Sequence, residues 1–140
     1  MVHIDITYAG ALRTEALHGP SGSQLTTDAP LDNQGRGESF SPTDLVATAL
    51  GACMLTIMGI VAEREGLDLA GAHVHVKKVM VTGPVRRIGA LEVEVTVPVD
   101  PGEAARRKLQ QAAETCPVRA SLGSEIDIPI RYRFGAPAEA

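Results

Sequence analysis

A run of eighteen residues without a charged side chain, Leu45 to Ala62 (LVATALGACMLTIMGIVA), limits what this chain can fold into more than any other feature. Its length lies at the lower edge of a membrane-spanning helix. The flanking residues Asp44 and Glu63 are acidic, and no cluster of Lys and Arg orients the run, so we expect no membrane partner. A helix that is apolar all round in a soluble protein should be buried on every side. A single subunit offers little material to wrap such a helix, so the run predicts a homodimer.

Composition narrows the class of protein further. The 140 residues, of which 44% are apolar and 21% charged, predict one domain over residues 1–140. A net charge of -4 and an aromatic content of 3%, with no long run of Lys and Arg, predict that the chain binds no nucleic acid. Two cysteines without a disulfide framework, behind an N-terminus that lacks the pattern of a signal peptide, predict a cytoplasmic protein.

The hydrophobic periodicity predicts three short strands, a long helix, two long strands, a second helix and a last strand. Because strands and helices are partly segregated along the chain, the fold class is α+β rather than a doubly wound parallel sheet. A loop of this length between the third strand and the first helix is typically functional or mobile. The predicted strands are 2–8, 11–17, 23–27, 72–82, 87–98 and 126–134, the helices 41–66 and 103–115, with a helical turn over 117–122 and the loop over 28–40.

The start of the long helix carries clear capping chemistry. Ser41 is a preferred N-cap residue, Pro42 suits the first helical position, and Asp44 follows the cap by three residues. This spacing predicts a capping box, in which the Ser41 hydroxyl and the Asp44 carboxylate each accept a backbone N–H of the other residue.

The two cysteines are the main candidates for chemistry. Cys53 lies in the middle of the apolar helix, where a thiol is usually a small core residue. Cys116 precedes Pro117 at a helix break and could cap the next turn, a position that favours the thiolate. The residues alone therefore favour Cys116 as the reactive thiol. The spacing does not show that the two thiols meet, but one reactive thiol and one resolving thiol are what the reversible step from sulfenic acid to disulfide requires.

Two segments resemble the cysteine motifs of the OsmC/Ohr family: FSPTDL over residues 40–45 with ALGAC over 49–53, and CPV over 116–118 with Ser121-Leu122. The resemblance implies an intertwined homodimer with two interface sites, each holding both cysteines of one chain and residues of the partner. It implies a thiol peroxidase that reduces organic hydroperoxides or hydrogen peroxide without a cofactor. Cys53 would then be oxidised to a sulfenic acid, Cys116 would resolve it as a disulfide, and a dithiol or another thiol would reduce the pair. The resemblance thus makes Cys53 the reactive thiol, whereas the residues alone favour Cys116.

The resemblance also implies an arginine that stabilises the Cys53 thiolate and a glutamate that positions the arginine. Two arginines are candidates: Arg13 on the second predicted strand and Arg36 in the long loop. The glutamate is expected ten residues before Cys53, where this chain has Thr43.

Two acidic residues could replace that glutamate, the neighbouring Asp44 and, less directly, Glu38 in the loop. On an ideal helix Asp44 lies opposite Cys53 and about 13 Å along the axis, so capping Ser41 is the simpler role for it.

Two other functions remain open at the level of sequence. The chain could be a binding module whose interface cavity holds a small ligand without turnover, which the missing glutamate favours, or both cysteines could be core residues of a dimer that catalyses nothing. His73 and His75 lie two apart on one strand and could bind a metal with His18, but such a pair is more typical of a solvated strand face, so we predict no metal site.

Overall fold

The structure, a computed structural model, describes residues 1–136, and the chain divides into an N-terminal unit (Met1–Val46) and a second unit that begins at Ala47. The strands are β1 (Ile4–Gly10), β2 (Arg13–His18), β3 (Gln24–Asp28), β4 (His73–Val81), β5 (Arg87–Val97) and β6 (Ile130–Phe134). The helices are α1 (Pro42–Arg64), α2 (Glu103–Glu114), the short α3 (Pro117–Ser121) and a 3-10 turn, η1 (Leu31–Asn33).

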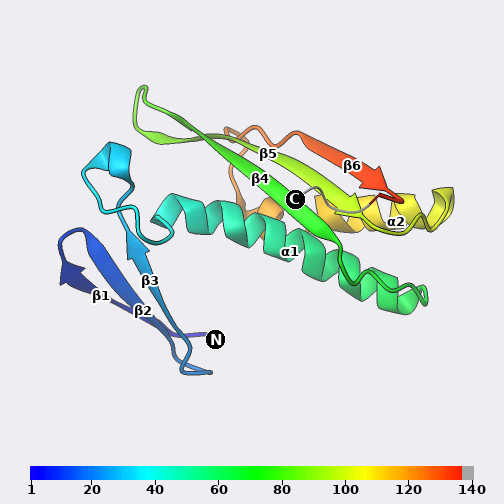
Figure 1. Cartoon of the computed structure of the whole chain (residues 1–140), viewed down its shortest axis with the longest axis horizontal. Coiled ribbons are helices and arrows are strands. Elements are labelled where there is room, and N and C mark those ends of the chain that lie inside the picture. The colour runs from blue at the N-terminus through cyan, green and yellow to red at the C-terminus, as the bar shows by residue number, and fades with distance from the viewer. Residues whose placement is uncertain (137–140) are drawn as a thin grey trace. The chain divides into compact units, whose positions relative to one another are not determined.

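The N-terminal unit is an antiparallel meander in the order β1-β2-β3 (Figure 1). Successive side chains alternate between its two faces. One face is polar and includes Asp5, Thr7 and Glu15, whereas the other carries large apolar side chains that are exposed within the chain. The exposed apolar side chains of that second face, here called the open apolar face, are Ile4, Ile6, Tyr8 and Leu25.

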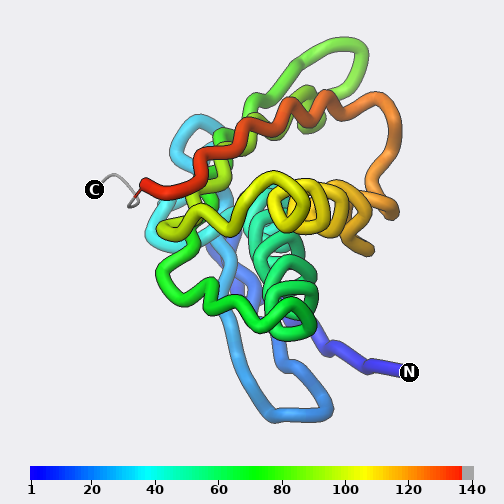
Figure 2. Tube along the Cα trace, turned by 90° about the vertical axis from the view of Figure 1, so that its right-hand side faces the viewer, coloured from blue at the N-terminus to red at the C-terminus, as the bar shows by residue number. Residues whose placement is uncertain are grey.

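The second unit contains a three-stranded sheet in the order β4-β5-β6, with β4 antiparallel and β6 parallel to β5. Helices α1 and α2 lie on one side of this sheet (Figures 1 and 2). Helix α2 covers β6, where the Tyr132 hydroxyl lies 3.4 Å from the Gln110 carbonyl and the Arg106 guanidinium lies over the Phe134 ring. Alternate β5 residues point into this layer, where Leu91, Val93, Val95 and Val97 are buried. Its fully buried side chains include Leu50, Met54, Met58, Leu91, Val95, Val97 and Leu109.

Helix α1 packs closely on β4 at Gly51. A Cβ atom at Gly51 would lie 3.2 Å from side-chain carbons of both Val74 and Val76, so the helix approaches the strand closely. Within residues 1–136, α1 is the one helix that is long and apolar enough to cross a bilayer, although the core helix of a soluble protein passes the same test. Only 33% of its most apolar window is buried inside the chain. The chain by itself therefore does not bury the helix on every side, which agrees with the expectation that a single subunit offers too little material to wrap it.

The predicted α+β class and the order of elements are confirmed, and most element ends agree within about two residues. The last strand is the main exception, since it starts at Ile130 rather than at residue 126. Pro129 lacks an N–H, and the chain before β6 joins β5 irregularly, through bonds from Leu91 to the Asp127 carbonyl and from Val93 to the Pro129 carbonyl. The third strand has the predicted length of five residues but is shifted by one position, so that it ends at Asp28.

The core of the second unit predicts a clear stability contrast. Met58→Ala removes a fully buried side chain beneath the sheet, so the free energy of unfolding should fall by about 2–5 kcal/mol. Val85→Ala truncates a side chain exposed in the β4–β5 connection and should change it by less than about 0.5 kcal/mol. Urea unfolding at one fixed protein concentration measures both variants. Equal effects would contradict the described core.

Candidate functional site: an arginine cluster and a pair of thiols

The beginning of α1 has the predicted capping box. The Ser41 N–H donates to the Asp44 carboxylate at 2.9 Å, and the Asp44 N–H donates to the Ser41 hydroxyl at 3.1 Å. Asp44 thus satisfies a backbone donor at the start of the helix, the role that the spacing predicted. Thr43, at the position where a glutamate was expected, lies 3.2 Å from the Ser41 hydroxyl through its own hydroxyl.

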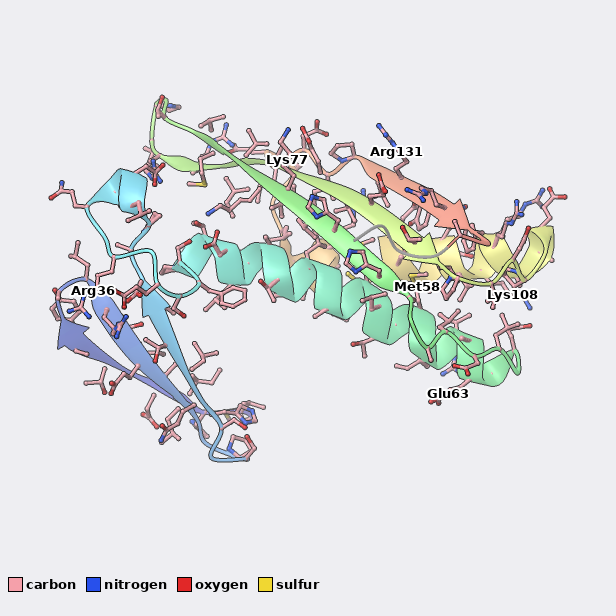
Figure 3. All side chains as sticks on the ribbon, viewed as in Figure 1. Arg36, Met58, Glu63, Lys77, Lys108 and Arg131 are labelled. Carbon is pink, nitrogen blue, oxygen red and sulfur yellow. The ribbon has the colours of Figure 1, made fainter. Side chains whose placement is uncertain are left out.

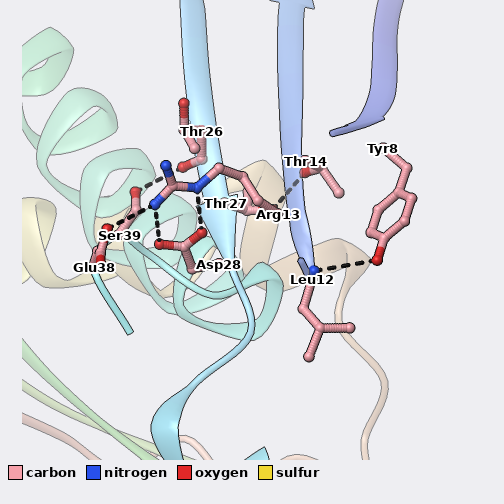
Figure 4. Close-up of polar contacts among 9 residues, drawn as sticks. All are labelled: Tyr8, Leu12, Arg13, Thr14, Thr26, Thr27, Asp28, Glu38 and Ser39. Carbon is pink, nitrogen blue, oxygen red and sulfur yellow. Dashed lines mark hydrogen bonds and ion pairs between the residues drawn. The ribbon is translucent and has the colours of Figure 1, made fainter. Parts of the chain in front are cut away.

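Arg13 is held by two carboxylates, and neither belongs to α1 (Figure 4). Its Nε and Nη2 atoms donate to the two oxygens of Asp28 at 2.7 and 2.9 Å, and Nη2 also donates to Glu38 at 3.1 Å. Such a bidentate arrangement is the strongest geometry for an arginine–carboxylate pair. The Asp28 side chain is only 1% exposed. The pairing holds the pKa of Asp28 below its ordinary value and raises that of Arg13, so both groups stay charged.

The long loop returns to the end of β3 and closes over Asp28. The Asp28 N–H donates to the Phe40 carbonyl at 3.1 Å, and the Ser39 hydroxyl donates to the Thr26 carbonyl at 2.7 Å. Gly35 packs so tightly that a Cβ atom there would lie 1.7 Å from the Ala29 carbonyl oxygen. Arg36 follows this glycine (Figure 3), and its charge contributes to the lowered pKa of Asp28. Both candidate arginines therefore belong to one cluster around Asp28.

The two cysteines meet in the second unit although they are far apart in sequence. Both are free thiols; Cys53 is partly exposed on α1, whereas Cys116 is fully buried. Cys116 is the N-cap of α3, and its sulfur accepts the N–H of Arg119 at 3.4 Å, as the Cys-Pro sequence predicted.

The cap position was expected to favour the Cys116 thiolate, but the pKa of Cys116 is instead raised. Burial raises the pKa of Cys116 more than the N–H of Arg119 lowers it, and hydrogen bonding and charge from Cys53 raise it further. Cys116 therefore tends to keep its proton.

The structure thus brings the predicted site residues into two groups. Arg13, Arg36 and Glu38 lie with Asp28 in the N-terminal unit, and Cys53 lies with Cys116 in the second unit. Asp28 was missed because its Asp-Ala-Pro context reads as the start of a loop. Counting outward from the turn at residues 19–22 would have found it, since an antiparallel hairpin centred there pairs Arg13 with Asp28.

A groove in the second unit is lined by neither cysteine. It has a volume of about 570 Å³ and lies on the side of the sheet that faces away from α1, where Figure 3 labels Lys77 and Arg131. Opposite charges on neighbouring strands pair across it, as in the 3.4 Å contact of Lys77 with Glu92. His75 also lines it, whereas His18 belongs to the N-terminal unit and lies 2.6 Å from the Ser21 hydroxyl.

The buried Cys116 thiol predicts a measurable titration. In a Cys53→Ser variant, the pKa of Cys116 should remain above the ordinary thiol value of about 8.5, because burial is the largest cause of the shift. The folded state then keeps a proton that the unfolded state loses, so stability should fall as the pH rises above about 8.5. The rate of alkylation by iodoacetamide against pH measures the titration, with the denatured protein as control. Matching midpoints in the folded and denatured protein would contradict the described burial.

Comparison with known proteins identifies the family. The model of the family described as OsmC-like protein matches residues 35–131. One similar crystal structure is from Psychrobacter arcticus 273-4 and is described as an osmotic stress induced and detoxification response protein. Its sequence is 42% identical to this chain. The match covers 94% of this chain and 96% of that chain, with a TM-score of 0.89. No curated protein matches the chain.

More distant structures share the fold. An organic hydroperoxide resistance protein from Legionella pneumophila is 15% identical, with 95% and 96% of the two chains covered and a TM-score of 0.77. An OsmC like protein from Mycoplasma pneumoniae is 16% identical, with 96% of each chain covered and a TM-score of 0.81. The family model matches most of the chain and includes both cysteines. The chain therefore belongs to the OsmC/Ohr family of OsmC-like proteins.

Proposed function

We propose that this protein is a thiol peroxidase that reduces organic hydroperoxides or hydrogen peroxide. The observation that carries the proposal is the pairing of a partly exposed thiol, Cys53, with a buried thiol, Cys116, that tends to keep its proton. Because Cys53 is accessible, it is suited to react with the substrate. Because Cys116 is buried, it is suited to react with oxidised Cys53 rather than with the substrate. The name of the Legionella relative, an organic hydroperoxide resistance protein, supports the same substrate class.

The reaction proceeds in two steps on the protein. The Cys53 thiolate attacks one oxygen of the peroxide, the O–O bond breaks, and the leaving alkoxide takes a proton to form an alcohol, so that Cys53 becomes a sulfenic acid. The Cys116 sulfur then attacks the Cys53 sulfur, and the sulfenic hydroxyl leaves as water with the Cys116 proton. With an organic hydroperoxide the products are one disulfide, one alcohol and one water, and with hydrogen peroxide a second water replaces the alcohol. A dithiol or another thiol donor returns both cysteines to the reduced state.

An arginine has two tasks in this proposal. It stabilises the Cys53 thiolate and provides N–H donors for the peroxide oxygens as negative charge develops on them. Arg13 suits this role better than Arg36, because two carboxylates fix its guanidinium and the bidentate pair holds it in one orientation.

The proposed reaction predicts a defined product. One equivalent of cumene hydroperoxide should convert the two free thiols into one intrachain disulfide, a loss of two hydrogen atoms that mass spectrometry detects. In the Cys116→Ser variant, Cys53 should stop at the sulfenic acid, which dimedone traps. In the Cys53→Ser variant, neither product should form. Untouched thiols in the folded wild-type protein would exclude the peroxidase and favour a binding module without turnover.

We also propose that the protein acts as a homodimer. The open apolar face of the N-terminal unit exposes several large apolar side chains; Ile6, for example, is 62% exposed. Helix α1 is also incompletely covered within the chain, since 33% of its most apolar window is buried. Exposed apolar surface of this extent is typical of a face that another protein surface covers, and a second copy of the chain would cover both.

The open apolar face predicts which substitution weakens the dimer. Ile6→Lys places a charge on that face and should shift the protein toward the monomer, because burying an unpaired charge is strongly unfavourable. Thr7→Lys is the matched control, since the next residue of β1 points to the polar face beside Asp5 and Glu15. Light scattering coupled to gel filtration measures the mass. A wild-type monomer, or a dimer that withstands Ile6→Lys, would contradict the proposal.

A further inference from the structure

We infer that Asp28 is a positioning residue that orients Arg13 for the reaction, an inference that rests on the proposed function. The Asp28 carboxylate binds Nε and Nη2 of the guanidinium together, and Glu38 takes a further donor on Nη2. A guanidinium has five N–H donors. Among residues 1–136, no hydrogen bond or ion pair uses the Nη1 group of Arg13. The arginine therefore presents one donor group in a fixed direction.

Burial makes Asp28 the dominant partner of Arg13. Asp28 is 1% exposed, whereas Glu38 is 64% exposed and binds through a single oxygen. An exposed ion pair contributes little, because water screens it and a long side chain loses freedom to hold it. The backbone N–H of Glu38 and the charge of Arg36 also favour the ionised form of Asp28. Asp28 thus remains a fixed anion under Arg13, and Glu38 is an accessory.

The chain contains an internal comparison for this pair. Arg106 binds Asp100 through the same two nitrogen atoms, with Nε donating at 2.8 Å. That pair belongs to the second unit, and its two side chains are 41% and 45% exposed. The two pairs share the bidentate geometry, and they differ in burial and in the second carboxylate, Glu38, that also binds Arg13. Asp100→Asn is therefore a matched control for Asp28→Asn.

An amide is a poor replacement for the Asp28 carboxylate. Asparagine has one carbonyl oxygen, so it accepts from Nε or from Nη2 and turns its NH2 group toward the other donor. The guanidinium must then rotate to avoid two donors facing each other. A misplacement of about 1 Å in a reacting group costs on the order of 100-fold in rate.

The first experiment measures the second-order rate of Cys53 oxidation by cumene hydroperoxide. Asp28→Asn should slow the reaction by about 10- to 100-fold, whereas Asp100→Asn should stay within about twofold of wild type. Glu38→Gln should fall between them. An Asp28→Asn protein as fast as wild type would overturn the inference.

Arg13→Lys covers the case in which Asp28→Asn does not fold. Lysine keeps a positive charge opposite the buried carboxylate but cannot form the two-pronged contact. It should slow the oxidation by about the same factor as Asp28→Asn. A wild-type rate for Arg13→Lys would overturn the inference, because the orientation of the guanidinium would then be irrelevant.

A second experiment separates this inference from the proposed function. In 15N-labelled protein, the Nε–H resonance of Arg13 should exchange slowly with water, and Asp28→Asn should shift it and accelerate its exchange. Glu38→Gln should leave it in place, since Glu38 binds Nη2 only. If wild-type Cys53 does not react with peroxide, the proposed function fails. The Nε–H resonance would still show whether Asp28 holds Arg13 in place. A resonance that Asp28→Asn leaves unchanged would overturn the inference, whatever the activity.

Discussion

The contact between one face of α1 and β4 is the constraint on which the second unit depends. Gly51 allows the helix to approach Val74 and Val76 closely, and this contact fixes the rotation of the helix about its axis. Cys53 follows two residues later, about 200° further round the helix, and so turns away from the strand. A residue on the sheet side, such as Met54, is fully buried, whereas Cys53 is only partly covered. The packing that buries the core thus leaves this one thiol accessible.

Burial also decides the properties of the charged groups. Asp28 and Asp100 form the same bidentate pair with an arginine, but the loop over residues 29–40 covers only Asp28. The tight approach of Gly35 to Ala29 keeps that loop folded back on the end of β3. An exposed pair exchanges with water and fixes little, whereas a covered pair in which both partners are satisfied holds its geometry. The loop therefore helps to fix the orientation of Arg13, although it contains little regular secondary structure.

Much of the fold could be predicted from the sequence, because the periodicity of apolar residues and the capping signals are local. The Ser41–Asp44 capping box and the Cys116 cap were both predicted and confirmed. Asp28 was not, because its place opposite Arg13 depends on strand register and its burial on the return of a distant loop. The raised pKa of Cys116 could not be predicted from the sequence either. The local helix end favours the thiolate, but the surrounding core, which is assembled from separate segments, disfavours it more strongly.

The arrangement of the thiols has a consequence for the order of the two steps. Two neighbouring thiols rarely ionise together, because the first negative charge raises the pKa of the second. In this pair burial acts on Cys116 in the same direction as the charge of Cys53, so the proton stays on the buried sulfur. That proton is needed only when the hydroxyl leaves Cys53 as water. In the proposed cycle, the Cys116 thiol therefore keeps its proton during the first step and gives it to the departing hydroxyl in the second.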